Sequence, residues 1–324
     1  MKNWPKFSLL PKLNTRKIAF IAILIAISVA FFIIIVNLVP IASIPTFKIS
    51  FIGLPIKISG FIFGPIIGGL VGCLSDLISF LFVPNVFNPY YILAAVVNGV
   101  VSGIIGWLFL NVIKNYFGGK RKDLVLSLQI FKLKNKLEKL KGKLVSHKAK
   151  KIRKLENNII YLNEKRKKNN LLGTQSELKN FNGVIAALIL VTLILLIIWI
   201  IGFKVPQSAI NNGVIKNRLI LILLMISGFA VMIIFIWIAR FKMKDKNYFV
   251  IVPIIIFSAL IEFINVPILS LADSQALSSS DGLFIYIFQH TLFSPVKIWF
   301  NMFIIFFTFN VINGLINKNS NISY

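Results

Sequence analysis

The chain has 324 residues, of which 57% are hydrophobic and 14% charged, and its formal net charge is +26. Soluble domains have about 45–50% apolar and about 25% charged residues, so the composition excludes an ordinary soluble enzyme, a disordered chain and a secreted disulfide scaffold. It is typical of a protein that crosses the membrane several times.

Eight apolar segments are predicted to be helices, because runs of about 20 apolar residues match the thickness of a bilayer. The first follows a basic leader and is too long for the apolar part of a signal peptide, so we interpret it as an uncleaved helix. One segment is short and ends at Gly64–Pro65, which should break a helix. The predicted helices cover residues 18–39, 52–64, 66–83, 91–113, 184–203, 219–239 and 248–271, with the last inside 283–316.

The basic residues gather in three clusters that predict the orientation of the chain. Of the 36 Lys and Arg residues, 20 lie in residues 114–183, five in the first 17 residues and four in residues 240–246. Cytoplasmic segments of membrane proteins carry an excess of Lys and Arg. All three clusters fall on one side only if segment 52–64 is counted as a crossing. The pattern therefore predicts eight crossings with both termini in the cytoplasm.

Residues 114–183 form a basic insertion that we expect to be helical. Its segment 123–168 contains no Pro and a single Gly, and its Leu and Ile residues form two rows at helical spacing, separated by a four-residue stutter. The narrow seam favours either a coiled-coil hairpin or one long helix. Such an arm suits RNA or anionic lipid, but aromatic residues for base stacking are sparse, so a solvated arm is the simpler interpretation. The rows are Leu133, Leu137, Leu140 and Leu144, then Ile152, Leu155, Ile159 and Leu162.

Motifs for enzymatic chemistry are missing from the sequence. There is no GxxxxGK[ST] loop, no HExxH and no GxSxG. The two histidines, His147 and His290, lie in different regions, and Cys73 is the single cysteine. We therefore expect neither an enzyme nor an ATPase, and no cofactor, disulfide or metal site.

Polar residues inside the apolar segments are the better lead, because burying them in lipid costs free energy unless they are paired or used. Two interpretations stay open, and both can hold. One is a structural ion pair of Asp76 or Glu262 with Lys57 or Lys297. The other is an outward-facing pocket for a polar small molecule. In the predicted topology the outer half of the membrane holds Asn98, Asn265, Gln289 and His290.

Small residues recur every four positions in two places. Gly60, Gly64, Gly68 and Gly72 form one row, which we interpret as close helix packing. The first helix carries a stripe that suits a close-fitting helix, either a neighbour in this chain or a partner protein. The stripe consists of Ala22, Ala26 and Ala30.

The segment 44–109 has an ordered set of short motifs. It contains FKISF, then LPI, a Gly, FGP and a GxxxG run closing in SD, followed by a Pro, a short loop and an aromatic residue opening the next helix. This order resembles the S components of energy-coupling factor (ECF) vitamin transporters, the folate family in particular. The tail fits as well, since Asn265 in EFINVPILSL and the segment QHTLFSPVKIWFN resemble the last two helices of these proteins.

The resemblance implies an all-α integral membrane protein with a six-helix core. Residues 1–113 would form its first four helices and residues 248–324 its last two. S components have about 200 residues, so two elements here are extra: the basic cytoplasmic helical insertion at 114–183 and two transmembrane helices within 184–247. Two additional helices keep the orientation of the core unchanged.

The resemblance also implies a function. S components lie in the plasma membrane and capture a vitamin at the outer face. They deliver it inward with a transmembrane coupling protein and two ATP-binding cassette ATPases, which agrees with the missing ATP motif. The Ala stripe resembles the motif by which their first helix docks on the coupling protein. Folate is the first candidate substrate, with pantothenate or riboflavin as alternatives, because Gln289 and His290 stand where the folate branch suggests an Arg.

A heterocyclic vitamin would stack on Phe47, Tyr90 or Tyr91, under caps formed by loops 40–51 and 84–89. The ring amides would bond to Asn98, Asn265 or Gln289, and a carboxylate tail to Lys48, with Lys57 or His290 as alternates. The tyrosines also fit an interfacial aromatic belt, and Lys48 fits a solvated loop charge.

Two other classes compete with a transporter subunit. A membrane insertase or ribosome-docking protein would explain the basic arm. Such insertases, however, share an Arg inside the membrane, and the apolar segments here lack one. A structural membrane anchor would need its polar residues only for pairing. Nucleic acid is not an expected partner, whereas the lipid bilayer is.

Overall fold

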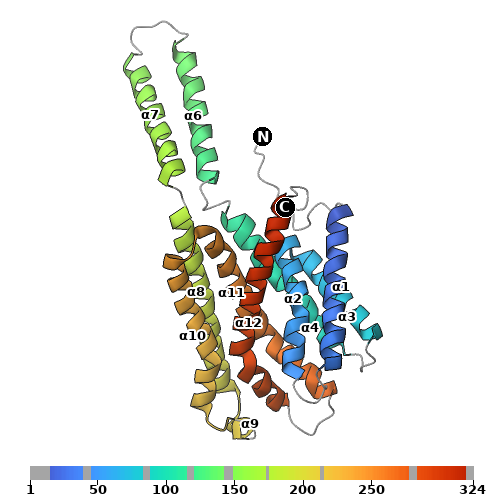
Figure 1. Cartoon of the computed structure of the whole chain (residues 1–324). Coiled ribbons are helices and arrows are strands. Elements are labelled where there is room, and N and C mark those ends of the chain that lie inside the picture. The colour runs from blue at the N-terminus through green and yellow to red at the C-terminus, as the bar shows by residue number, and fades with distance from the viewer. Residues whose placement is uncertain are drawn as a thin grey trace. The chain divides into compact units, whose positions relative to one another are not determined.

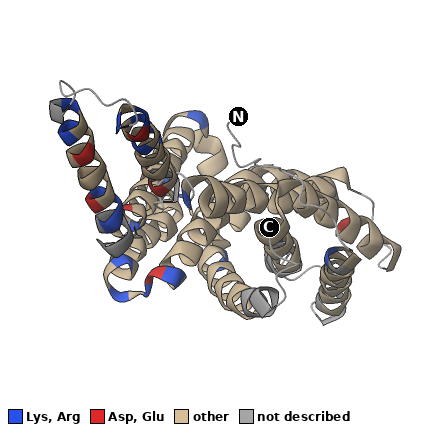
Figure 2. Cartoon of the chain, turned by 90° about the horizontal axis from the view of Figure 1, so that it is seen from above, with Lys and Arg blue, Asp and Glu red and all other residues tan. Residues whose placement is uncertain are grey.

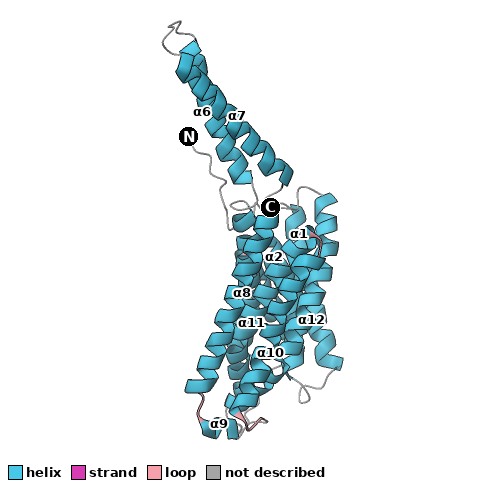
Figure 3. Cartoon of the chain, turned by 90° about the vertical axis from the view of Figure 1, so that its left-hand side faces the viewer, coloured by secondary structure: helices cyan, strands magenta, loops and turns pink. Residues whose placement is uncertain are grey.

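The computed structural model describes residues 15–38, 45–82, 88–114, 120–141, 149–172, 175–211, 215–276 and 283–318. Every regular element in these ranges is a helix (Figure 3). The predicted all-α membrane fold is therefore confirmed. The chain divides into two compact units, Met1–Phe109 with Gly183–Tyr324, and Leu110–Asn182.

The larger unit contains the apolar helices (Figure 1). Seven helices among the described residues are long and apolar enough to cross a membrane, and they coincide with seven of the eight predicted segments. The chain order is α1 (Thr15–Leu38), α2 (Pro45–Phe63), α3 (Pro65–Phe82), α4 (Pro89–Trp107, continued as π-helix to Ile113), α8 (Gln175–Trp199, continued as π-helix to Lys204), α9 (Gln207–Asn211), α10 (Arg218–Lys242), α11 (Asp245–Ala276) and α12 (Leu283–Lys318). Of these, α2 and the short α9 are not among the seven.

Helix α2 is longer than the sequence indicates. It starts at Pro45, so the loop expected at 40–51 is wrong in its second half. Proline is well suited to the first turn of a helix, where its missing N–H needs no partner. Nineteen residues give a length of about 28 Å, close to the hydrocarbon thickness. The helix ends at Phe63, Gly64 follows with a φ of 93° that favours glycine, and Pro65 then starts α3. Eight crossings remain a prediction.

Glycines bring α2, α3 and α4 into backbone contact. A Cβ atom added to Gly60 or Gly68 would strike the carbonyl oxygen of Gly99, and one added to Gly99 would strike that of Gly68. Larger residues at these three positions would push the helices apart. The predicted close packing of the glycine row is therefore confirmed at this contact.

Helix α11 lies at the centre of the larger unit and is buried over most of its length. Phe61 of α2 packs on Phe257 of α11 and Phe309 of α12, with ring centroids 5.4 and 4.9 Å apart. Helix α10, one of the two additional helices, packs against α12 through Phe235 and Trp299, whose rings meet edge to face at 5.3 Å. These contacts fix the helices that carry the buried polar residues.

The smaller unit is a helical hairpin of α6 (Lys120–Lys141) and α7 (Ala149–Leu172). Of the two forms left open by the sequence, the structure has the hairpin. Leu126, Ile130 and Ile159 are buried along its seam, and the predicted row members 133, 137, 140, 152, 155 and 162 are half-buried. Leu144 lies outside the described residues.

Ion pairs join the two helices of the hairpin. Arg166 donates to both carboxylate oxygens of Asp123, at 2.6 and 3.2 Å, and Lys141 lies 2.7 Å from Glu156. The Asp123 carboxylate raises the pKa of Arg166 through hydrogen bonding and charge. Lys and Arg occur along both helices of the hairpin, among fewer acids (Figure 2), and most of those whose burial the structure describes are exposed. Most of its charge is therefore solvated.

Candidate functional site

Four helices of the larger unit direct buried polar side chains toward one another. In α12 these residues follow one another at intervals of four, three and four positions, which places them on one helical face. In α11 the intervals are three and eight, again on one face. The residues, buried except for the half-buried Tyr91 and Glu262, are Lys57 of α2, Tyr91 and Asn98 of α4, Glu262, Asn265 and Asp273 of α11, and His290, Ser294, Lys297 and Asn301 of α12.

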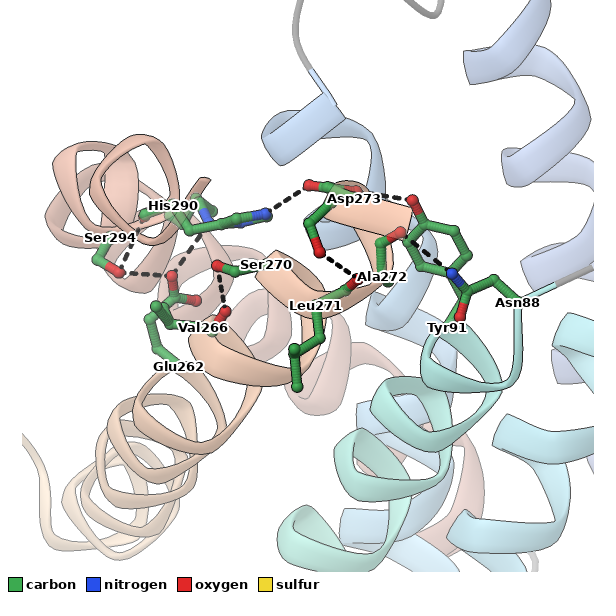
Figure 4. A network of polar contacts seen from close by, with 12 residues as sticks. Asn88, Tyr91, Glu262, Val266, Ser270, Leu271, Ala272, Asp273, His290 and Ser294 are labelled. Carbon is green, nitrogen blue, oxygen red and sulfur yellow. Dashed lines mark hydrogen bonds and ion pairs between the residues drawn. The ribbon is translucent and has the colours of Figure 1, made fainter. Parts of the chain in front are cut away.

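Asp273 links three of these elements at one end of the site (Figure 4). Tyr91 donates its hydroxyl hydrogen to Oδ1 of Asp273 at 2.7 Å, and Nε2 of His290 lies 2.7 Å from Oδ2. Both carboxylate oxygens therefore have a partner, although the residue is buried. The prediction that this helix ends at residue 271, which would leave Asp273 outside it, is therefore wrong. The helix continues to Ala276 instead.

Asn88 ties the start of α4 to the same end of α11. Its side chain caps α4 by accepting the Tyr90 N–H at 3.0 Å, and its amide nitrogen donates to the carbonyl of Ala272 at 3.1 Å. Pro89 follows the cap, as is common at a first helical position. The cap therefore holds Tyr91, in the first turn of α4, in place beside Asp273.

Asn98 and Asn265 meet in the middle of the site. The Asn265 amide nitrogen donates to Oδ1 of Asn98 at 3.1 Å and to the Ala94 carbonyl at 3.4 Å. Gly53 of α2 closes the third side, since a Cβ atom there would lie 2.9 Å from Nδ2 of Asn98. The two asparagines predicted to bind ring amides are thus brought together.

Glu262 organises the deepest part of the site. Its Oε1 accepts hydrogen bonds from Lys297 Nζ at 3.0 Å and from the Ser294 hydroxyl at 2.6 Å. Of the ion pairs that the sequence left open, Asp76 or Glu262 with Lys57 or Lys297, the structure has the pair of Glu262 with Lys297. Lys57 is also buried and interacts electrostatically with both members of that pair. Lys297 therefore pairs with Glu262 while Lys57 adds a second positive charge nearby, so this part of the site attracts negative charge or hydrogen-bond acceptors.

The remaining predicted residues lie around this centre or outside the description. Tyr90 and Gln289 are half-buried next to Tyr91 and His290 in the chain. Asp76 of α3 is half-buried and interacts electrostatically with Tyr91, without a place in the Glu262 ion pair. Phe47 and Lys48 belong to the first turn of α2, but their side chains lie outside the described residues, as does most of the cap 84–89. Ala22, Ala26 and Ala30 are exposed on α1.

Four participants were missed from the sequence: Asn88, Asp273, Ser294 and Asn301. A signal existed for three of them. Asp273 follows Asn265 by eight residues and Ser294 follows His290 by four, and both intervals keep a residue on the same helical face. Asn88 stands directly before Pro89, a common arrangement at the start of a helix.

Some polar atoms in the site lack a partner within the described part of the chain. They are the Asn265 side-chain oxygen, the His290 Nδ1 atom and the Thr291 hydroxyl, all buried. An unpaired buried polar atom costs about 1–3 kcal/mol, which a bound ligand can recover by supplying the missing hydrogen bond. The described residues contain no group of three His, Cys, Asp or Glu side chains suited to a metal ion. The arrangement suits binding of a polar small molecule.

Comparison with known proteins gives three results. Residues 12–133 match the family model described as "ECF-type riboflavin transporter, S component". The uncharacterized protein MG098 homolog of Mycoplasma pneumoniae is 31% identical over 110 residues, covering 32% of this chain and 22% of that protein. The folate transporter FolT of Clostridium novyi is 34% identical over 61 residues, covering 18% of this chain and 36% of FolT.

The chain thus spans between about a fifth and about two fifths of the length of these curated relatives. No solved structure matches. The family match covers α1 to α4 and extends into α6, so it includes the glycine-packed helices and the Tyr91–Asn98 side of the site. The resemblance to S components drawn from segment 44–109 is confirmed over that part of the chain.

Proposed function

We propose that this chain is the S component, the substrate-binding membrane subunit, of an ECF-type vitamin importer. One observation carries the proposal: the part of the chain that matches an S-component family supplies two of the four helices of the polar site, and α11 and α12 supply the other two. A multi-pass membrane protein whose polar residues converge between helices is built to bind a ligand. We place it in the plasma membrane with both termini in the cytoplasm.

The order of the layers supports capture from outside. The α2–α3 turn at Gly64 and Pro65 contacts Gly103, near the end of α4, whereas Asn88 and Tyr91 mark the start of α4. If the turn lies in the cytoplasm, the contacts of Asp273 with Tyr91 and His290 form the outer layer of the site. The contacts of Glu262 then form a layer deeper in the membrane. A ligand entering from outside therefore meets Tyr91 and His290 first.

The chemistry of the layers supports a heterocyclic vitamin. An aromatic ring would stack on Tyr90 or Tyr91, while ring amide groups bond to Asn98, Asn265 and Gln289. A carbonyl or carboxylate would be drawn toward Lys57, with Phe47 and Lys48 contributing from the start of α2. Folate is our first candidate, which the similarity to FolT favours. The riboflavin family model makes riboflavin the main alternative, and pantothenate comes third.

Energy for transport would come from partners: a transmembrane coupling protein and two ATP-binding cassette ATPases. The docking surface that we propose is the stripe of Ala22, Ala26 and Ala30. These side chains are exposed on α1 in the structure, so the stripe is free to contact another membrane helix.

An uptake assay tests the proposal. Vesicles that contain this chain with its coupling module should accumulate one labelled vitamin from a panel of folate, riboflavin and pantothenate when ATP is present inside. Asn98→Ala should weaken uptake. Ser227→Ala, on the exposed side of α10, is the matched control and should leave it unchanged. Absence of uptake for every vitamin in the panel, from a folded and assembled complex, would contradict the proposal.

A further inference from the structure

The hairpin has a second apolar surface besides its seam. Leu124, Leu128 and Phe131 follow one another at intervals of four and three on α6, and they are 59%, 52% and 60% exposed. Their spacing places them on one helical face. The seam residues Leu126 and Ile130 lie on the opposite face and are buried. We call the three exposed residues the ridge.

The ridge occupies one part of the hairpin. On α6 and α7, the large hydrophobic residues that the structure shows as exposed all lie at residues 124–131 or at 160 and 161. Residues 132–141, nearer the tip of α6, contribute none of them. Among the described residues of α6, the exposed apolar residues therefore cluster in the half that follows the α4 span in the chain, and such a cluster indicates a contact made there.

The base of the hairpin is tied to the membrane at both ends. Residues 114–119 join the end of the α4 span at Ile113 to the start of α6 at Lys120. A linker of this length keeps Ile113 and Lys120 within roughly 25 Å of each other. On the other side α7 ends at Leu172 and the α8 span begins at Ser176, a separation of roughly 15 Å at most. The ridge is therefore within reach of the lipid surface.

The charge around the ridge favours anionic lipid. Residues 120–172 contain 18 Lys and Arg residues and four acids. Lys132 and Lys134 are exposed on the two sides of the ridge just beyond Phe131. A helix with apolar residues on one face and lysines beside them typically lies in the interface of a membrane that contains anionic lipids. RNA is a poorer fit, since two of the three ridge residues are leucines that cannot stack on bases.

We propose that the α6–α7 hairpin lies on the cytoplasmic membrane surface, with the ridge inserted among anionic lipids and α7 facing the solvent. The hairpin then binds the membrane surface through both the apolar ridge and its lysines. This inference does not depend on the identity of the vitamin or on the S-component assignment.

Site-specific fluorescence tests it on the full chain. A Cys73→Ser background leaves no native cysteine, so a single probe can be attached through Phe131→Cys on the ridge. The control is Asn157→Cys, an exposed position of α7 on the face away from the seam. The chain is placed in nanodiscs of brominated phosphatidylcholine, with or without phosphatidylglycerol.

Lipid bromines should quench the probe at 131 in the discs with phosphatidylglycerol, more weakly in discs of phosphatidylcholine alone, and not at 157. Leu128→Glu should abolish quenching at 131, because it places a carboxylate within the ridge, while circular dichroism keeps its helical signal. Two results would overturn the inference. One is no quenching at 131 in the discs with anionic lipid. The other is a probe at 131 that responds to added RNA and not to lipid.

Discussion

The core site and the hairpin both carry charge, but they use it in opposite ways. In the core, Lys297 and Asp273 are buried and the Glu262 side chain is 12% exposed, and each carboxylate has partners on other helices. In the hairpin, the pair of Lys141 and Glu156 is 55% and 41% exposed, and most of the other charges face solvent. More than half of the net charge of +26 therefore lies in the hairpin, and the excess indicates how the chain is oriented in the membrane. The few buried charges, in contrast, mark the candidate binding site.

Removing one member of an ion pair should give the largest difference in stability loss between the core and the hairpin. Glu262→Gln leaves Lys297 and Lys57 buried without the nearby carboxylate, which should cost about 3–5 kcal/mol of stability. The matched change Glu156→Gln in the hairpin should cost less than about 1 kcal/mol, because that pair is solvated. Thermal unfolding in detergent measures both. Equal losses of stability would show that the two ion pairs do not differ in the way their burial predicts.

The glycine contact should give the next largest effect. Gly99→Ala places a methyl group against the Gly68 carbonyl and should destabilise the core by about 1–3 kcal/mol. Gly202→Ala is the control, because nothing lies within 4 Å of the added Cβ atom there. Its unfolding midpoint should stay close to that of the unchanged chain. A stable Gly99→Ala variant would argue that α3 and α4 are less closely packed.

Much of the fold could be predicted from the sequence, because the length and apolarity of a segment determine where a membrane helix forms. Seven helices were predicted close to their observed positions, whereas the start of α2 was not. Pro45, Lys48 and Pro55 interrupt its apolar run, so the apolar pattern alone places the helix too late. The end of α11 was missed for a similar reason: Asp273 looks like a loop residue until its partners on α4 and α12 are known.

The site could be predicted only in part. Asn98, Asn265 and His290 were singled out as polar residues in apolar segments, which needs no tertiary structure. Their pairing depends on how the helices face each other, which one sequence does not specify. Asp273, which connects Tyr91 to His290, therefore became visible only in three dimensions.

Loss of a single amide in the site should have a moderate effect on ligand binding. Asn265→Ala removes the hydrogen bond to Asn98 and the oxygen that is free to bind a ligand. One hydrogen bond is worth about 0.5–1.5 kcal/mol, so the Kd for the vitamin should rise by about threefold to tenfold. Thr192→Ala, on the exposed side of α8, is the control for isothermal titration. An unchanged Kd for Asn265→Ala would favour the view that the polar residues serve pairing alone.

Replacing the hairpin should have the smallest effect of all on binding. A Gly/Ser linker in place of residues 120–172 leaves every described residue of the polar site in the chain. The Kd for the vitamin should therefore match that of the full chain within error, while the basic surface is lost. A large rise in Kd, with the core still folded, would show that the two regions do not act separately.

Mass spectrometry of the purified full chain shows directly whether the protein carries a vitamin. An S component that binds its vitamin tightly should release one vitamin, close to one molecule per chain, when the protein is denatured. The Asn98→Ala and Asn265→Ala double variant should release less, and the chain with the hairpin replaced should release the same amount. A folded full chain that carries no vitamin, and binds none from the panel when it is supplied, would contradict the account.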